Sequence, residues 1–100
     1  MMVVGPAVVV VPPLELDLAS AGELEQDISN AYLAGAGLVT VDFATVLFCD
    51  SSGLRVLVNA ANLARRRGAL FEVRNPSRQL LLMASIVGAS DVLDLPPPPG

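Results

Sequence analysis

Near the middle of the chain the sequence reads FCDSSGL, from Phe48 to Leu54. The stretch before it, Leu38 to Phe43, is mostly apolar and β-branched, which indicates a buried strand. After it, apolar residues recur at helical spacing, so a helix is predicted to begin near Gly53. The seven residues are therefore expected to form a strand-to-helix junction.

Three small polar residues, Asp50, Ser51 and Ser52, stand at this junction. The simplest interpretation is that they cap the helix, because side-chain oxygens there accept hydrogen bonds from the free N–H groups of the first turn. One cap is enough, however, so a hydroxyl group is left over. That hydroxyl is expected to be exposed at the positive end of the helix dipole, a place that tolerates a phosphate group.

The helix that begins at the junction is predicted to end at Gly68, a natural stop. Its last turn contains Arg65-Arg66-Arg67, interpreted as a solvated helix end that complements the dipole, with a docking patch as the alternative. Leu70 to Arg74 alternates apolar and charged residues and predicts a strand. A last helix follows from Asn75-Pro76-Ser77 and ends at Gly88.

On the N-terminal side, Val8 to Val11 and Leu14 to Leu18 predict two strands separated by a proline turn. Ser20-Ala21-Gly22-Glu23 is a capping-box pattern for a helix that runs to about Leu33. Gly35-Ala36-Gly37 ends that helix. A nucleotide-binding glycine loop would follow a strand and open a helix, so this one is interpreted as a helix stop.

The element order is β-β-α-β-α-β-α, which predicts an α/β fold. Residues 1–95 are expected to form a single domain, with helices packed against a mostly parallel central sheet of about four strands. The leading pair of strands is expected to form an antiparallel edge. Residues 96–100 are a proline-rich tail that is predicted to be disordered.

Composition excludes several classes of function. The formal net charge is −4 and the only basic cluster is Arg65-Arg66-Arg67, so no nucleic-acid partner is expected. Apolar runs are far shorter than the ~20 residues that span a bilayer, and no signal-peptide pattern is present, so a cytoplasmic location without membrane contact is expected. The hydrophobic fraction of 53% leaves a homodimer open.

Catalytic and metal-binding residues are scarce. The chain has no histidine, which removes Ser-His and Cys-His nucleophile pairs and histidine-based metal sites. The single cysteine, Cys49, cannot form an internal disulfide and is expected to be a small buried core residue rather than a redox sensor. No enzyme activity and no cofactor or metal are expected.

The junction also carries a resemblance. Cys49 to Leu54, preceded by Val41-Asp42-Phe43 and Val46-Leu47-Phe48, resembles the signature of the STAS domain, the fold of sulfate transporters and anti-sigma factor antagonists. More narrowly, the chain is similar to single-domain bacterial anti-sigma factor antagonists from about Val8 to Leu95. Further matches are Glu15-Leu16-Asp17, Arg67-Gly68-Ala69, Asn75-Pro76 and Val87-Gly88.

The resemblance implies a switch in which Ser51 is the phosphoacceptor. The kinase would be the anti-sigma factor itself, captured by the unphosphorylated antagonist so that a sigma factor is released, and a separate serine phosphatase would reset the switch. The partner-binding residues implied by the resemblance are Asp17, Asp50, Ser52, Gly53 and Leu54. The chain departs from the family in having Leu14, after two prolines, where glycine is usual before Glu-Leu-Asp.

Three other interpretations stay open. The first is a STAS subunit bound constitutively to a transporter ATPase, in which the serine is only a cap. The second is a hydrolase with Ser51 as nucleophile, although the Gly-x-Ser-x-Gly elbow and a histidine base are missing. The third is nucleotide binding at the strand ends, where open α/β sheets place ligands.

Overall fold

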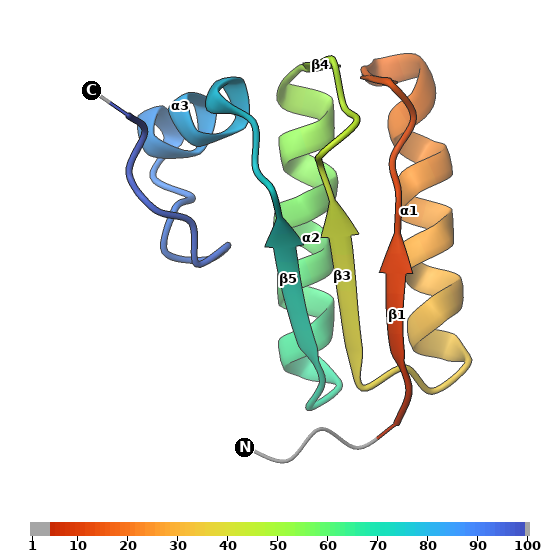
Figure 1. Ribbon diagram of the computed structural model, residues 1–100. Helices are drawn as coiled ribbons and strands as arrows, with labels where there is room; N and C mark the ends of the chain where they lie inside the picture. The colour runs from red at the N-terminus through yellow and green to blue at the C-terminus, as the bar shows by residue number, and fades with distance from the viewer. Residues whose placement is uncertain (1–4, 100) are drawn as a thin grey trace.

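The computed structural model describes residues 5–99, which form an α/β domain (Figure 1). In chain order the elements are β1 (Ala7–Val10), β2 (Glu15–Leu16), α1 (Leu18–Leu33), β3 (Leu38–Asp42), β4 (Phe48–Cys49), α2 (Ser51–Arg66), β5 (Leu70–Arg74) and α3 (Arg78–Val87). The predicted fold class, three helices with a mostly parallel sheet, is confirmed.

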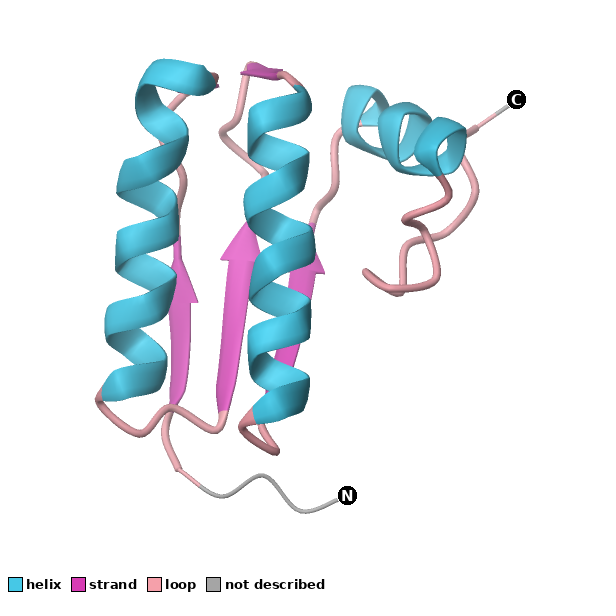
Figure 2. Ribbon diagram, turned by 180° about the vertical axis from the view of Figure 1, so that it is seen from behind, coloured by secondary structure: helices cyan, strands magenta, loops and turns pink. Residues whose placement is uncertain are grey.

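The main sheet has three strands in the order β1-β3-β5, and both pairings are parallel. Helices α1 and α2 cover one face of this sheet, and α3 lies beyond β5 at the carboxyl end of the strands (Figures 1 and 2). The register places Val9 opposite Thr40 and Thr40 opposite Glu72. None of the helices among residues 5–99 is both long enough and apolar enough to cross a bilayer.

The predicted antiparallel edge is wrong. β1 and β2 do not pair with each other, because the chain continues in one direction through Pro12-Pro13 instead of turning back (Figure 1). β2 pairs in parallel with β4, a two-residue strand that was not predicted, and together they form a separate small sheet. Thus β1–β2 and β3–β4 run side by side, and each leads into a helix.

Helix α1 begins two residues before the predicted cap. Its N-cap is Asp17, whose carboxylate accepts a hydrogen bond from the Ser20 N–H at 3.1 Å, while the Ser20 hydroxyl accepts one from the Asp17 N–H at 3.0 Å. This reciprocal pair is a capping box in which Ser20 is the third helical residue instead of the cap. The predicted strand at Leu14–Leu18 is shortened to Glu15–Leu16 as a result.

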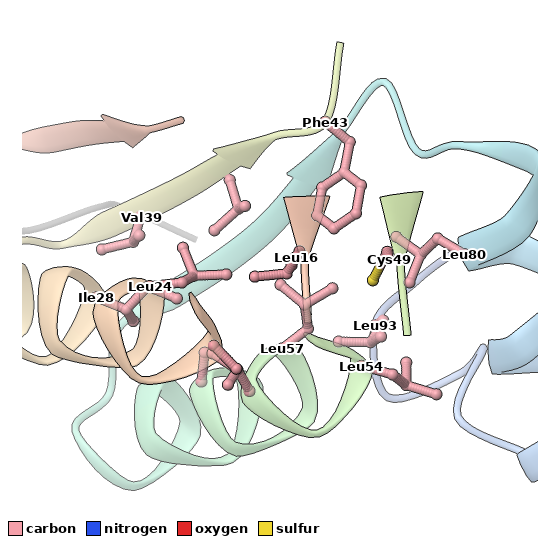
Figure 3. Packing of buried hydrophobic residues seen from close by; sticks show 14 of the residues in the cluster. Leu16, Leu24, Ile28, Val39, Phe43, Cys49, Leu54, Leu57, Leu80 and Leu93 are labelled. Atoms are coloured by element: carbon pink, nitrogen blue, oxygen red, sulfur yellow. The ribbon is translucent and has the colours of Figure 1, made fainter. Parts of the chain in front are cut away.

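The core lies between the main sheet and the helices and is almost purely aliphatic (Figure 3). Its largest fully buried side chains come from every layer and include Leu16, Leu24, Ile28, Tyr32, Val39, Val41, Phe43, Leu57 and Leu80. Leu16, from the two-residue strand β2, has no exposed surface. The small sheet is therefore part of the core, which extends to the carboxyl ends of the main strands.

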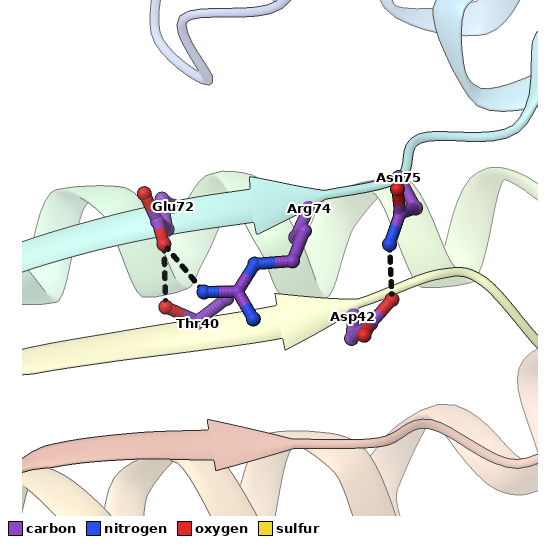
Figure 4. Close-up of polar contacts among 5 residues, drawn as sticks. All are labelled: Thr40, Asp42, Glu72, Arg74 and Asn75. Atoms are coloured by element: carbon purple, nitrogen blue, oxygen red, sulfur yellow. Dashed lines mark hydrogen bonds and ion pairs between the residues drawn. The ribbon is translucent and has the colours of Figure 1, made fainter.

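Polar side chains tie β3 to β5 on the face that the helices do not cover (Figure 4). The Thr40 hydroxyl donates a hydrogen bond to Glu72 at 2.7 Å, and Arg74 lies 3.5 Å from the same carboxylate. Asn75 donates to Asp42 at 3.1 Å, and the Asp42 carboxylate also accepts from the Ala44 N–H at 2.9 Å. These bonds lower the pKa of Asp42 and hold the β3–β4 loop against the end of β5.

Tyr32 supplies a testable link between α1 and the sheet. Its hydroxyl donates a hydrogen bond to the Leu70 carbonyl at 2.8 Å, and burial raises its pKa from 10.0 to about 12. The folded protein thus favours the neutral phenol of Tyr32. The stability that Tyr32 contributes in this form is complete below pH 10 and is lost as the pH rises through 12.

We expect Tyr32→Phe to lower the free energy of unfolding by about 1 kcal/mol at pH 7. It should also remove part of the stability loss at alkaline pH. Urea unfolding at pH 7 and pH 11 measures both effects. Cys49 titrates in the same alkaline range, so the difference between wild type and variant is the relevant quantity. An alkaline loss of equal size in both proteins would contradict the assignment.

Candidate functional site

The predicted junction is present, and a single residue caps it. Helix α2 begins at Ser51, and the Asp50 carboxylate accepts a hydrogen bond from the Ser52 N–H at 2.8 Å. The Asp50 carbonyl accepts from the N–H groups of Gly53 and Leu54 at 3.1 and 3.3 Å. Asp50 therefore performs the capping that the sequence could have assigned to any of three residues.

Ser51 is left free by this arrangement. It is the first residue of α2, is exposed, and makes no side-chain hydrogen bond to any residue in the range 5–99. Ser52 is half-buried beside it. The next exposed residue on the same side of the helix is Arg55, four positions on, so the Ser51 hydroxyl has one cation within a helical turn.

Gly53 packs where no side chain fits. A Cβ atom built on it would lie 2.7 Å from Cys49 Sγ and 2.8 Å from two carbon atoms of Leu16. Its backbone dihedral angles are helical, so close approach and not conformational freedom requires glycine here. The first turn of α2 is thereby pressed directly onto the small β2–β4 sheet.

Asp17 lies at the same end of the molecule. Leu16 is paired with Cys49 in the small sheet, and the next residue on each strand, Asp17 or Asp50, caps the following helix. The Asp50 N–H donates a hydrogen bond to the Leu16 carbonyl at 3.0 Å. The structure therefore brings together Asp17, Asp50, Ser51 and Ser52.

Gly53 and Leu54 do not share that surface. Gly53 is buried against the small sheet, and the Leu54 side chain is 5% exposed within the core. Their implied role as partner-binding residues stays a prediction, and their burial favours a supporting role for them beneath that surface.

Four exposed apolar residues next to the site were not predicted. Leu14 and Leu47 are 57% and 79% exposed, and Leu18 and Phe48 are 80% and 44% exposed. The Leu14 carbonyl accepts hydrogen bonds from the N–H groups of Leu47 and Phe48, so these three are neighbours, and Leu18 follows Asp17 directly. We call these four residues the apolar rim. Of the four, only Phe48 belongs to a short strand; Leu14 and Leu47 precede β2 and β4, and Leu18 begins α1.

Gln79 was also missed, and no local pattern indicates it. Its side-chain carbonyl, from α3, accepts a hydrogen bond from the Cys49 N–H at 3.0 Å across 30 positions of sequence. The strand β4 is thus held by β2 on one side and by α3 on the other. This leaves Phe48 and Asp50, which flank Cys49, in fixed positions.

Cys49 lies within the core, as its sequence context predicted, with no exposed surface. Burial, and to a smaller extent the negative charge of Asp50, raise the pKa of its thiol to about 11, so the thiol is protonated at neutral pH. Across residues 5–99, no three His, Cys, Asp or Glu side chains form a group that could hold a metal ion.

A known protein family matches most of the chain, including the junction. The family described as "Mlab, STAS domain" matches residues 14–95, which include every residue of the junction. The chain belongs to the STAS domain family. The two short strands, the Asp50 cap and the exposed Ser51 are thus features of a STAS domain.

Three known proteins are similar to this STAS domain. The anti-sigma-B factor antagonist of Bacillus subtilis (strain 168) is 28% identical over 81 residues, which are 81% of this chain and 73% of that protein. The phosphorylated form of the Bacillus cell fate determinant SpoIIAA matches 91% of this chain and 83% of its own, with a TM-score of 0.71 and 24% identity. The protein TM1081 matches 90% and 74%, with a TM-score of 0.75 and 18% identity.

The contact at Gly53 generates a prediction with a matched control. Gly53→Ala should lower the free energy of unfolding by about 1–2 kcal/mol, because Leu16 or Cys49 must shift. Gly22→Ala makes the same change in α1, where no atom lies within 4 Å, and should raise stability by about 0.5–1 kcal/mol. Urea unfolding of both variants is the measurement. Equal effects at the two sites would refute close packing at Gly53.

Proposed function

We propose that this STAS domain is an anti-sigma factor antagonist that has no catalytic activity and is switched by phosphorylation of Ser51. The observation that carries the proposal is the exposed Ser51 hydroxyl at the start of α2, free of the capping that Asp50 performs. The unphosphorylated protein binds an anti-sigma factor that is also its serine kinase. Capture of that protein releases a sigma factor, and a serine phosphatase restores the free hydroxyl.

The first turn of α2 suits a phosphate. A phosphoserine carries about −1.5 to −2 charges at neutral pH and is stabilised at the positive end of a helix dipole. Arg55 stands one turn further along and adds a cation. The negative charge of the nearby Asp50 carboxylate would repel the phosphate, but the hydrogen bond from the Ser52 N–H holds that carboxylate at the helix cap. Phosphorylation therefore leaves the helix intact.

The effect of the phosphate falls on binding. Ser51 lies at the end of the molecule that exposes the apolar rim, Leu14, Leu18, Leu47 and Phe48. A partner that packs on this rim removes water from its surroundings. A dianion in that contact would lose its hydration beside Asp50 and Asp17. The first turns of α1 and α2 contain no basic residue, and Arg55 is in the next turn of α2. Affinity then falls sharply.

The comparisons support this proposal. The relative from Bacillus subtilis is named as an antagonist of an anti-sigma factor, and SpoIIAA, which shares the fold, has a structure in a phosphorylated form. For this chain we infer a partner-binding surface formed by Asp17, Asp50, Ser52 and the apolar rim, with Gly53 and Leu54 beneath it as support.

The central test is the binding of Ser51 variants and of the phosphoprotein. Ser51→Ala should bind the anti-sigma kinase as wild type does, whereas Ser51→Asp and authentic phosphoprotein should bind at least a hundredfold more weakly, about 2.7 kcal/mol. Titration calorimetry measures the affinities, and thermal unfolding should show that all forms stay folded. Mass spectrometry after incubation with kinase and ATP should find a single phosphate, on Ser51.

Two outcomes would overturn the proposal. One is a phosphate on Ser20, Ser77 or Ser90 in place of Ser51. The other is phosphoprotein that binds the kinase as tightly as the unmodified form. Capture of a transporter ATPase irrespective of phosphorylation would instead support the constitutive subunit, and turnover of ATP or esters that vanishes in Ser51→Ala would support an enzyme.

The apolar rim gives a second test with a matched control. Leu47→Asp should weaken kinase binding at least tenfold, because Leu47 is 79% exposed beside the junction and a carboxylate there would be desolvated on binding. Ile86→Asp makes a comparable change on α3, where Ile86 is 80% exposed, and should leave binding unchanged. Both variants should melt as wild type does. If Ile86→Asp abolishes binding and Leu47→Asp does not, the docking surface lies on α3 instead.

A further inference from the structure

The outer side of β1 is an open edge of the main sheet. The strand order is β1-β3-β5, and within residues 5–99 nothing pairs with β1 on the side away from β3. On the sheet face away from the helices, Val9 is 54% exposed, and Val11, the first residue after the strand, is 59% exposed. Such an edge presents unpaired backbone N–H and C=O groups that can pair with another strand.

The central residues of this edge include no charged residue or proline that would prevent pairing with another strand. Proteins often protect an exposed edge strand with a charged residue, most often lysine, yet residues 7–11 read AVVVV and the whole chain has no lysine. Pro6 and Pro12 stand immediately outside these five residues and cannot donate to a ladder. The prolines therefore restrict any added strand to a window whose middle residue is Val9.

We propose that the occupant of this edge is a second copy of the chain, paired through β1 in antiparallel fashion about a two-fold axis at Val9. The window is uncharged and nearly uniform, so it is complementary to itself in this orientation, as a two-fold contact requires. Val9 pairs with Val9 of the second copy, and Ala7 pairs with Val11. The two three-stranded sheets become one sheet of six strands.

The arrangement is compatible with the rest of the molecule. In an antiparallel pair the carboxyl ends of the strands point in opposite directions, so the two Ser51 sites lie at opposite ends of the dimer and stay accessible. Each α1 lies against its own β1 on the helix-covered face of the sheet (Figure 2) and exposes Glu23, Glu25 and Asp27 with no basic residue. The two helices should repel, so the dimer is expected to tighten as added salt screens them.

Cysteine cross-linking tests the register. Residues directly opposite in an antiparallel pair have Cβ atoms about 4.5–5.5 Å apart, so Val9→Cys should form a disulfide-linked dimer under mild oxidation. Val11→Cys is the matched control: it is equally exposed, but its partner across the axis is Ala7, so it should link much less. The native Cys49 is fully buried, and wild type should not link. Equal linking of both variants, or of Val11→Cys alone, would overturn the register.

Sedimentation measurements over a range of concentrations test the dimer itself. Wild type should show a reversible monomer–dimer equilibrium, and Val9→Lys should weaken it at least tenfold with an unchanged melting temperature. Val87→Lys, at a 65% exposed position on α3, should dimerise as wild type does. A wild type that stays monomeric up to its solubility limit would refute the proposal. Loss of the dimer in Val87→Lys but not in Val9→Lys would move the contact to α3.

Discussion

The close approach of α2 to the small β2–β4 sheet is the constraint on which the site depends. Gly53 leaves no room for a Cβ atom against Leu16 and Cys49, so the first turn of α2 is fixed relative to both short strands. Two-residue strands are too short to hold themselves together. They persist because Leu16 and Cys49 are completely buried and because Gln79 holds β4 from the side of α3. The positions of Asp17, Asp50 and Ser51 follow from that packing.

Local sequence signals were sufficient to predict a helix boundary where a single residue could perform the capping or stop role. Ser77 caps α3, and Gly68 and Gly88 follow α2 and α3 with positive φ angles, as their positions after the last apolar residues indicated. The capping box of α1 was misplaced because both Asp17 and Ser20 can cap, and only the reciprocal bonds decide between them.

Other features depend on contacts between distant residues and have no local signal. β4 consists of only Phe48 and Cys49, which are too few residues to show an alternating pattern, so it could not be predicted from the sequence. Without β4, the parallel pairing of β2 could not be predicted either. The antiparallel edge was inferred from adjacency of two strands in sequence, but the prolines between them carry the chain onward. The apolar rim was missed for a similar reason, since exposure of Leu14 and Leu47 follows only from how the short strands are placed.

The first five residues of α2 include both buried and exposed positions. Successive residues of a helix are rotated by about 100°, so Gly53 and Leu54 face the core while Ser51 and Arg55 face solvent. A charge added to the outer positions meets the helix dipole and Arg55, not the core. Under the proposed function, the fold would therefore accept a large change of charge at Ser51 that an apolar partner surface would not. A serine one turn further into the helix would lack the dipole, and a serine at the cap would already be hydrogen-bonded, so the first helical position is where both requirements meet.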